Sequence, residues 1–288
     1  MLKTAVIGAS GYIGRHLLAT YKTVYPEILG TTFSTKNPDL IFFDLKKPNI
    51  SLLKLEELGY QSVIIASVDN PLHITNKSRL IEAYERNVLG TIELIRQLGR
   101  TSLQTIFFST DYVFDGVLGN YTDSSPTLPT TEYGKHKVLV EKEIPLLTNN
   151  FMVIRLCKIY GLVKGDSTLL DEIAFKLFTG QVVQAAADQF FSPTLIDDLV
   201  AAILRLQSDQ KTGYFNLCSH EVWSRYQIAT LIAKAIGSDL ELVKAIKLHE
   251  LTCMAGRPLN TSMKCSNEIN YNFTPLAHSI EIMSQFYQ

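Results

Sequence analysis

The chain has 288 residues, with 27 Lys and Arg against 28 Asp and Glu, and a formal net charge of −1. This balance lacks the basic excess that binding to a phosphate backbone requires, so we expect no nucleic-acid partner. Hydrophobic residues make up 46% of the chain, which predicts a globular protein with a large core. No apolar run approaches the roughly 20 residues that span a bilayer, and no signal-peptide pattern precedes the first strand. We therefore expect a cytoplasmic protein with no membrane partner.

The four cysteines lack the paired short spacing of zinc ligands and the density of a disulfide framework. They are Cys157, Cys218, Cys253 and Cys265. We therefore expect reduced thiols, as in the cytosol, and no bound metal.

A glycine-rich turn follows the first expected strand, at residues 4–7, and leads into a helical pattern at residues 15–21. Gly8 suits the turn itself, Gly11 lets the backbone approach a phosphate, and Gly14 lets the helix pack closely on the strand. The start of the helix then faces the negative charge of a pyrophosphate. This context predicts a dinucleotide-binding turn. The residues expected to contact the cofactor are Gly8, Ser10, Gly11, Tyr12, Ile13 and Gly14.

The second expected strand, at residues 27–33, ends without an acid. Folds that prefer NAD often hold the ribose 2′-hydroxyl with an acid at this point. Ser34 and Lys36 instead offer a hydroxyl and a positive charge, which suit a 2′-phosphate. The sequence therefore predicts NADPH as the cofactor, with NADH as the second choice. The alternative for Lys36 is a solvated turn in which the side chain contacts nothing.

The third expected strand, at residues 40–43, ends in Asp44 and Leu45. Asp44 either hydrogen-bonds the adenine amine or caps the helix that follows Pro48. Both residues are predicted to contact the cofactor.

The fourth expected strand, at residues 62–66, is followed by Ser67 and Val68, which we expect to pass beneath the cofactor ribose. Ala66 and Ser67 are predicted to contact the cofactor. A long amphipathic helical segment at residues 74–98 follows this strand. The alternation of short strands and helices predicts parallel βαβ units with right-handed crossovers. The expected fold class is therefore α/β, a doubly wound parallel (Rossmann) sheet whose ligands bind at the carboxyl ends of the strands.

The buried strand expected at residues 106–108 is followed by Thr110, and a helix start carries Tyr133 and Lys137. Residues four apart share one face of a helix, so an ammonium would lie beside a phenol and lower its pKa from about 10. The hydroxyl of Thr110 could hold a carbonyl oxygen next to that phenol. This arrangement predicts an acid for carbonyl reduction. The alternative is chance, because Tyr-x-x-x-Lys occurs in many helices.

The pattern becomes less regular after the strand expected at residues 151–156. We expect helices at residues 169–178, 195–206, 223–236 and 275–286, with short strands between them. Residues 1–156 with 194–219 are predicted to form the dinucleotide-binding domain. Residues 157–193 with 220–288 are predicted to form a smaller, mixed α/β region that binds the substrate.

The chain resembles the extended short-chain dehydrogenase/reductase superfamily, in the turn at residues 8–14 and in the pair Tyr133 and Lys137. Within that superfamily it is most similar to the dTDP-4-dehydrorhamnose reductases. The string Ser-Thr-Asp-Tyr-Val-Phe-Asp-Gly at residues 109–116 carries this second resemblance. Looser matches lie at Asp188-Gln189 with Pro193-Thr194, and at Arg257-Pro258 with Ser262.

The resemblance implies a hydride transfer from NADPH to C4 of a nucleotide-linked 4-keto-6-deoxy sugar, as in polysaccharide biosynthesis. It carries Thr110, Tyr133 and Lys137 over as the catalytic residues, with Tyr133 as the proton donor. Tyr133 and Lys137 would also contact the cofactor, Lys137 at the nicotinamide ribose. The residues expected to bind the sugar nucleotide are Asp111, Tyr112, Phe114, Lys158, Gln189 and Arg257.

Departures from the family pattern affect the expected reaction and assembly. Related dehydratases carry two acids after the threonine, whereas here Asp111 is followed by Tyr112, which disfavours dehydration. Lys158 replaces a tryptophan that would form an apolar wall for the sugar. His16 replaces an acid that some members link to metal-assisted dimerisation, so we expect no magnesium-bridged dimer, while a homodimer of another kind stays open.

Two rival functions are compatible with the same motifs. One is a non-catalytic, NADP-binding regulatory subunit, like that of methionine adenosyltransferase. The other is a sugar-nucleotide epimerase that retains its bound cofactor. The intact trio of Thr110, Tyr133 and Lys137 favours an enzyme over a regulator.

Overall fold

The structure is a computed structural model that describes residues 1–74, 76–251 and 256–287, so Cys253 lies outside the described residues. Contacts group the chain into two compact units. Unit 1 comprises Met1–Val113, Thr131–Arg155 and Ile203–Phe215, and unit 2 comprises Phe114–Thr130, Leu156–Ala202 and Asn216–Gln288. The two functional regions expected from the sequence stay a prediction, because contacts alone define these units.

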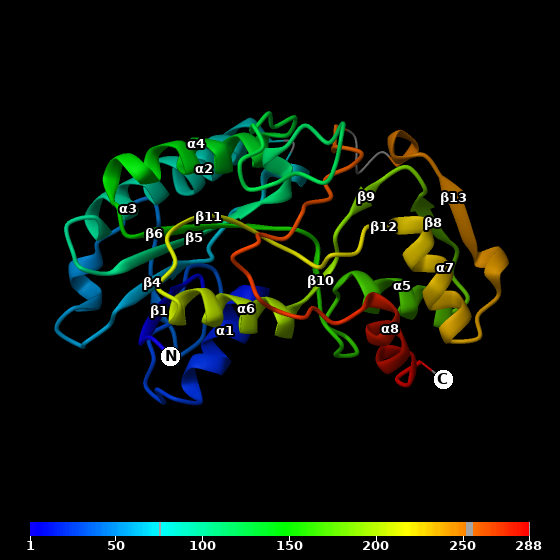
Figure 1. The fold of residues 1–288 in the computed structure, drawn as a ribbon, viewed down its shortest axis with the longest axis horizontal. Helices are drawn as coiled ribbons and strands as arrows, with labels where there is room; N and C mark the ends of the chain where they lie inside the picture. The colour runs from blue at the N-terminus through cyan, green and yellow to red at the C-terminus, as the bar shows by residue number, and fades with distance from the viewer. Residues whose placement is uncertain (75, 252–255, 288) are drawn as a thin grey trace. The chain divides into compact units, whose positions relative to one another are not determined.

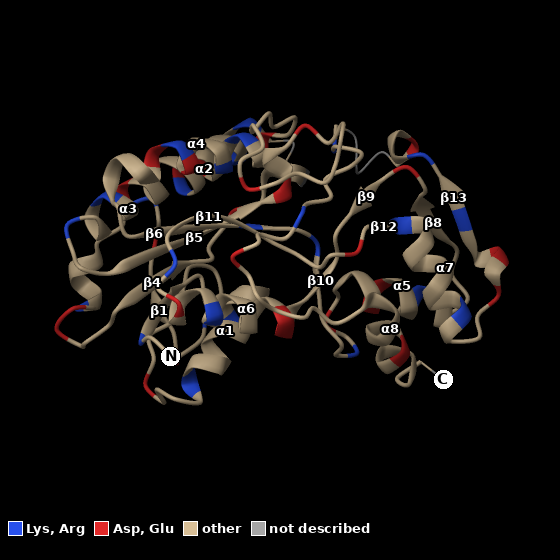
Figure 2. Cartoon of the chain, viewed as in Figure 1, with Lys and Arg blue, Asp and Glu red and all other residues tan. Residues whose placement is uncertain are grey.

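A five-stranded sheet forms the centre of unit 1, with strand order β1-β4-β5-β6-β11 (Figure 1). The strands are β1 (Thr4–Ile7), β4 (Ser62–Ile65), β5 (Gln104–Thr110), β6 (Phe151–Leu156) and β11 (Gly213–Leu217). The pairs β1–β4 and β4–β5 are parallel. Every residue of β1, β4 and β5 is buried and uncharged, and Figure 2 shows the charges on the surrounding helices and loops instead. Burial on both faces explains why these strands read as continuous apolar runs.

The second and third strands form a short parallel pair, β2 (Thr31–Thr32) with β3 (Ile41–Phe42). An isolated bridge between Val6 and Gly30 joins this pair to β1. Both strands are shorter than predicted. The backbone leaves β2 at once because the Thr32 hydroxyl donates to the carbonyl of Thr35 at 2.9 Å, which closes a turn. The order from β3 through β1 to β6 is that of a doubly wound sheet, which confirms the predicted fold class.

Helices cover the sheet of unit 1. They are α1 (Tyr12–Lys22), α2 (Lys77–Tyr84), α3 (Thr91–Leu98) and α4 (Glu132–Leu147). Thr131 caps α4 because its hydroxyl accepts from the amide of Gly134 at 3.1 Å. The single helix predicted at residues 74–98 is wrong in detail, because a π-helix, η3 (Glu85–Gly90), separates α2 from α3. Short 3₁₀ turns lie at η1 (Ile50–Leu53), η2 (Pro71–His73) and η4 (Asp111–Val113).

Unit 2 contains three small two-stranded sheets and several helices. The strand pairs are β7 (Ile159–Tyr160) with β10 (Thr194–Leu195), β9 (Phe190–Phe191) with β12 (Trp223–Ser224), and β8 (Val183–Ala186) with β13 (Val243–Ile246). The helices are α5 (Leu169–Phe178), α7 (Arg225–Ala235), α8 (Leu276–Ser284), and the 3₁₀ turns η5 (Leu240–Leu242) and η6 (Leu248–Glu250). Helix α6 (Ile196–Ser208) belongs to both units. Helix α7 begins later than predicted because Trp223 and Ser224 pair with β9, and Ser224 then caps the helix.

None of the helices among the described residues is long and apolar enough to cross a bilayer. The same residues contain no group of three or more His, Cys, Asp or Glu side chains that could hold a metal ion.

Candidate active site

The glycine turn brings β1, α1 and the end of β4 into close contact. Gly8 has φ +88°, and a Cβ atom there would lie 2.7 Å from the backbone of Ser67. A Cβ atom on Gly14 would lie 2.3 Å from the carbonyl oxygen of Gly8. Gly11 precedes the first turn of α1, and its amide donates to Gly8 at 3.1 Å. The first and third glycines are therefore required for close packing, and the start of α1 is left open to a ligand.

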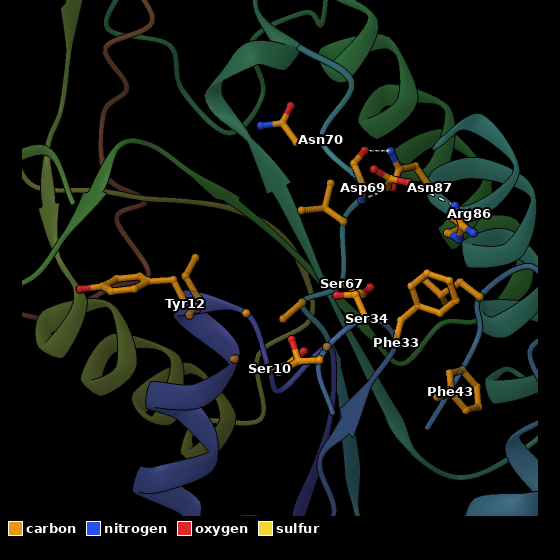
Figure 3. Close-up of a pocket in the computed structure, with 18 of the residues that line it drawn as sticks. Ser10, Tyr12, Phe33, Ser34, Phe43, Ser67, Asp69, Asn70, Arg86 and Asn87 are labelled. Atoms are coloured by element: carbon orange, nitrogen blue, oxygen red, sulfur yellow. Dashed lines mark hydrogen bonds and ion pairs between the residues drawn. The ribbon is translucent and has the colours of Figure 1, made fainter. Parts of the chain in front are cut away.

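A cavity of about 550 Å³ in unit 1 lies against this turn (Figure 3). Its size is that of a cofactor pocket. Ten residues predicted to bind the cofactor line it: Gly8, Ser10, Gly11, Tyr12, Ile13, Gly14, Ser34, Leu45, Ala66 and Ser67. Four others do not line it, namely Lys36, Asp44, Tyr133 and Lys137. Asp44 lies beside it and accepts from the amide of Lys46 at 2.9 Å, as an Asx turn.

Val68, expected beneath the ribose, also lines the cavity. Sequence reasoning missed several other residues that line it: Phe33, Thr35, Phe43, Asp69, Asn70, Arg79, Arg86 and Asn87. The side chain of Arg86 is 14% exposed, and its guanidinium lies 4.4 Å from the centre of the Phe33 ring. It pairs with Asp69 at 3.2 Å and with Asp44 at 3.8 Å. These acids already balance its charge. No motif marked Arg86 in advance, because its place depends on the π-helix and on a loop far away in sequence.

Asn87 fixes the loop after β4, at the edge of the cavity (Figure 3). Its side-chain oxygen accepts from the amide of Asp69 at 2.8 Å, and its nitrogen donates to the carbonyl of Asp69 at 2.6 Å. The same nitrogen lies 3.3 Å from Nδ1 of His136. One buried amide therefore replaces the backbone partners that this loop lacks.

A second cavity of about 290 Å³ adjoins the first, and both are lined by Ser10 and Thr35. It lies beside the segment that follows β2, where a dinucleotide fold places the ribose 2′ position. Arg15 and Lys22 of α1 line it, together with the acid Asp39. Within the described part of the chain, neither cation forms an ion pair. Lys36, the cation predicted for the 2′-phosphate, lines neither cavity.

The structure places Thr110 and Tyr133 together at the carboxyl end of β5. Thr110 is the last residue of that strand, and Tyr133 lies in the first turn of α4. Thr110 donates to a carboxylate oxygen of Asp111 at 2.9 Å and accepts from the amide of Tyr112 at 3.2 Å. The rings of Tyr112 and Tyr133 meet edge to face at 6.3 Å.

Lys137 lies close to both the ring of Tyr133 and the backbone of β5. Its Nζ donates to the carbonyl of Phe108 at 2.6 Å and lies 5.9 Å from the centre of the Tyr133 ring. Burial lowers the pKa of Lys137 to about 7, against the opposing charge of Glu141. A cation that is itself partly neutral exerts little pull on a phenol.

The pKa of Tyr133 is raised, first by burial and then by the negative charge of Asp111, while the nearby hydroxyl of Thr110 lowers it. The expectation that Lys137 lowers this pKa is therefore wrong for this structure. Spacing along a helix shows which residues are neighbours, but it does not show how far their side chains are removed from solvent.

The predicted substrate residues fall in both units. Asp111 and Tyr112 belong to unit 1, and the other four belong to unit 2. Phe114 is fully buried and stacks on Tyr121 with ring centres 4.3 Å apart. Gln189 is buried and accepts from Nε of Arg225 at 2.7 Å. Lys158 is exposed, and Arg257 is half-buried.

A family model described as the RmlD substrate binding domain matches residues 2–284. The chain belongs to this family. The family membership confirms the resemblance predicted from the sequence, because relatives named dTDP-4-dehydrorhamnose reductase are among the matches.

Three curated relatives show the range of proteins that are similar to this member of the RmlD substrate binding domain family. The spore coat polysaccharide biosynthesis protein SpsK of Bacillus subtilis (strain 168) is 29% identical over 245 residues, which is 84% of this chain and 82% of SpsK. The dTDP-4-dehydrorhamnose reductase of Aggregatibacter actinomycetemcomitans is 25% identical, covering 91% of this chain and 90% of its own. Methionine adenosyltransferase 2 subunit beta of Xenopus tropicalis is 23% identical, covering 92% and 80%.

Solved structures support the fold of this family member. A hypothetical dTDP-4-dehydrorhamnose reductase from Sulfolobus tokodaii superposes with a TM-score of 0.81 at 24% identity, covering 96% of this chain and 98% of the other. A dTDP-4-dehydrorhamnose reductase from Bacillus anthracis in complex with NADP gives 0.79 at 20% identity, covering 98% of both chains.

Proposed function

We propose that the protein is an NADPH-dependent reductase that acts on a nucleotide-linked 4-keto-6-deoxy sugar and reduces its C4 carbonyl. The observation that carries this proposal is that Thr110, at the end of β5, and Tyr133, in the first turn of α4, lie in the same unit as a cavity built on a glycine turn. A proton donor and a dinucleotide pocket are the two parts that a carbonyl reductase needs. The relatives and solved neighbours are nicotinamide-dependent oxidoreductases in several cases, which agrees with the class of activity.

The residues of the cavity fit a nicotinamide dinucleotide. The cavity of about 550 Å³ is lined by the glycine turn at the start of α1, where we expect the pyrophosphate, and by Ala66 and Ser67, where we expect the ribose. A bound NADPH would supply the hydride. Residues of this chain would then position the ketone and provide the proton.

In this proposal Tyr133 gives its proton to the ketone oxygen, Thr110 holds the phenol in place, and Lys137 supports the nicotinamide ribose. Asp111, Tyr112, Phe114, Lys158, Gln189 and Arg257 bind the sugar nucleotide. Tyr112 stands where a dehydratase has a second acid, so the protein lacks a base at that position for removing a proton beside the carbonyl. Plain reduction is the reaction that these side chains support. We also propose a cytoplasmic location. A measurement of the molecular mass in solution would distinguish a monomer from a homodimer.

The test is to incubate the protein with NADPH and a dTDP-4-keto-6-deoxyhexose, and to follow the nicotinamide absorbance and the sugar product. We expect one alcohol formed for each NADPH consumed. Cofactor that binds tightly but is not consumed with any keto-sugar nucleotide would favour a regulatory subunit, a role that the similarity to methionine adenosyltransferase 2 subunit beta keeps in view. Cofactor that stays bound while the sugar is inverted would favour an epimerase.

A further inference from the structure

His136 lies on α4 between Tyr133 and Lys137, but it does not line the cofactor cavity. It is only 5% exposed, and Asn87, which faces it from η3, is only 6% exposed. Nδ1 of His136 lies 3.3 Å from the side-chain nitrogen of Asn87. An unpaired polar group that is shielded from water destabilises a protein, so this contact matters for both side chains.

The backbone of Asp69 fixes the orientation of the Asn87 carboxamide. The side-chain oxygen accepts from the amide of Asp69 at 2.8 Å, and the side-chain nitrogen donates to the carbonyl of Asp69 at 2.6 Å. Exchanging the two atoms would place oxygen against the carbonyl and nitrogen against the amide proton. The atom that meets His136 is therefore nitrogen, and its second proton is available for Nδ1.

This geometry determines the tautomer of His136. A carboxamide nitrogen can only donate, so Nδ1 accepts, and the proton of the neutral ring lies on Nε2. The neutral form is favoured because burial lowers the pKa of His136, while Glu132 raises it and Lys137 lowers it further. The ring of Tyr84 meets that of His136 edge to face, with ring centres 5.4 Å apart. The acceptor is therefore held in place on the ring side as well.

We propose that His136 is a positioning residue, which holds the carboxamide of Asn87 and thereby holds the loop after β4 in the shape that the cofactor requires. Val68, Asp69 and Asn70 of this loop line the cofactor cavity, and so does Asn87. The role rests on the proposed function, because it takes NADPH as the ligand of that cavity. It adds a residue that acts on cofactor binding from α4 without touching the cofactor.

The loop after β4 is held at Asp69 by two neighbouring residues of η3. Arg86 pairs with the carboxylate of Asp69 at 3.2 Å, while Asn87 bonds to its backbone (Figure 3). Removal of the His136 ring would leave one N–H of Asn87 without its partner in a site that water does not easily reach. The carboxamide would then be free to turn away, and the backbone of the loop would lose its support while the ion pair remained.

The first test compares two replacements of His136. His136→Leu fills the site but removes the acceptor, whereas His136→Asn places a carboxamide oxygen near the position of Nδ1. Calorimetric titration with NADPH should show about tenfold weaker binding in the leucine variant, and the asparagine variant should recover most of that loss. Equal losses in the two variants, or no loss in the leucine variant, would overturn the proposal.

Val138→Ala is the matched control for a loss of packing. Val138 is 6% exposed and lies two residues further along the same helix. Its truncation should lower the free energy of unfolding and leave the affinity for NADPH unchanged. If it weakened NADPH binding as much as His136→Leu does, the effect would be one of packing alone, and the proposal would be overturned.

The tautomer can be read from the wild-type protein, so this test does not depend on the folding of a variant. The ring nitrogens of ¹⁵N-labelled histidine report which of them carries the proton, and the resonances of His136 are assigned through the contact with the ring of Tyr84. We expect the proton on Nε2 at neutral pH. A proton on Nδ1 would rule out the bond from Asn87 and with it the proposed role.

Turnover gives an independent reading. His136→Leu should raise the KM for NADPH and leave kcat at saturating cofactor nearly unchanged, because the lost interaction acts on binding and not on the transition state. A fall in kcat with an unchanged KM would contradict the role.

Failure of the proposed function would look different from failure of this role. If wild-type protein binds NADPH but reduces no keto-sugar nucleotide, the reductase function fails, and the binding data still decide the role of His136. If wild-type protein does not bind NADPH, the cofactor assignment fails. The role is then decided by the tautomer and by hydrogen exchange of the Asp69 amide, which should be faster in His136→Leu than in His136→Asn. Equal exchange in these variants would overturn it.

Discussion

Tyr133 and Lys137 show how much chemistry depends on surroundings that a sequence does not display. Their spacing on α4 is as predicted, yet burial acts against both charged forms. Tyr133 therefore stays protonated at neutral pH and can donate its proton. Lys137 is only partly charged, and a nearby negative charge would raise its pKa. A cofactor phosphate or a ribose hydroxyl would therefore change the pKa of Lys137 more than that of Tyr133.

Replacing Tyr133→Phe should lower turnover by orders of magnitude and leave NADPH affinity nearly unchanged, because the phenol acts mainly in the transition state. Stopped-flow oxidation of NADPH and calorimetric binding measure the two quantities. Ser10→Ala, within the cavity, is the matched comparison and should affect binding more than turnover. Full turnover in the phenylalanine variant would remove Tyr133 as the acid.

Lys137 should make the cofactor-free protein more stable as the pH rises. Its folded pKa is about 7 and its ordinary value is 10.5, so between these limits the unfolded chain binds more protons at this site. Its contribution therefore rises with pH in that window, by up to about 1.4 kcal/mol per unit. Below the window the penalty for burying the charge is complete and constant.

Lys137→Met should flatten this dependence, measured by urea unfolding between pH 7 and pH 10 without cofactor. Lys135→Met is the control, because Lys135 lies on the same helix but is exposed and paired with Glu132. A slope that is the same in wild-type protein and in both variants would show that the charge of Lys137 is not suppressed on folding.

At the scale of elements, we propose that the segment after β2 and helix α1 together select between the two cofactors. The short β2 turns immediately, and the following segment and α1 enclose the second cavity. The sequence indicated Lys36 from its position after the strand. The structure adds Arg15, which reaches the cavity from a different element and stacks on Tyr12 at 4.8 Å.

Alanine variants should separate these two cations. We expect Arg15→Ala to weaken NADPH binding about tenfold, or about 1.4 kcal/mol, and to leave NADH binding nearly unchanged. Lys36→Ala should have a smaller effect, because that side chain lines neither cavity. Lys142→Ala is the control, because Lys142 lies on α4, is exposed and lines neither cavity. Calorimetric titration with both cofactors, and with 2′,5′-ADP against AMP, measures the difference, and an equal loss for both cofactors in Arg15→Ala would contradict this assignment.

At the scale of the whole molecule, the predictable features are those that repeat along the chain. The doubly wound sheet, the glycine turn and the ends of β6 and α5 follow from apolar runs and local signals, and the structure has them as expected. Arg86, Arg15 and the bonds of Asn87 were not predictable, because each joins segments that are distant in sequence. The π-helix η3 was missed for another reason: it has the same amphipathic pattern as an ordinary helix.

Binding of NADPH should stabilise unit 1 first, because the cavity lies wholly within it. At a concentration one hundred times the Kd, the free energy of unfolding should rise by about 2.7 kcal/mol. Hydrogen exchange resolves where this occurs, and we expect slower exchange in the glycine turn and in the loop after β4. Slower exchange confined to unit 2 would contradict the position of the cofactor site, and a nucleotide without nicotinamide, such as dTDP, is the comparison ligand.

The π-helix η3 joins α2 and α3 into one continuous helical segment, and it sets which residues of that segment line the cavity and which enter the core. Beyond it, Leu94, Ile95 and Leu98 of α3 are completely buried, while Arg86 and Asn87, near its start, line the cavity. An ordinary helix advances about 100° per residue, so deleting one residue here would rotate the two halves against each other by that amount. Either the buried leucines of α3 would lose their core contacts, or Asn87 would lose its hydrogen bonds to the backbone of Asp69. Length in this segment is consequently as constrained as composition, and a shortened relative would need another way to hold the loop after β4.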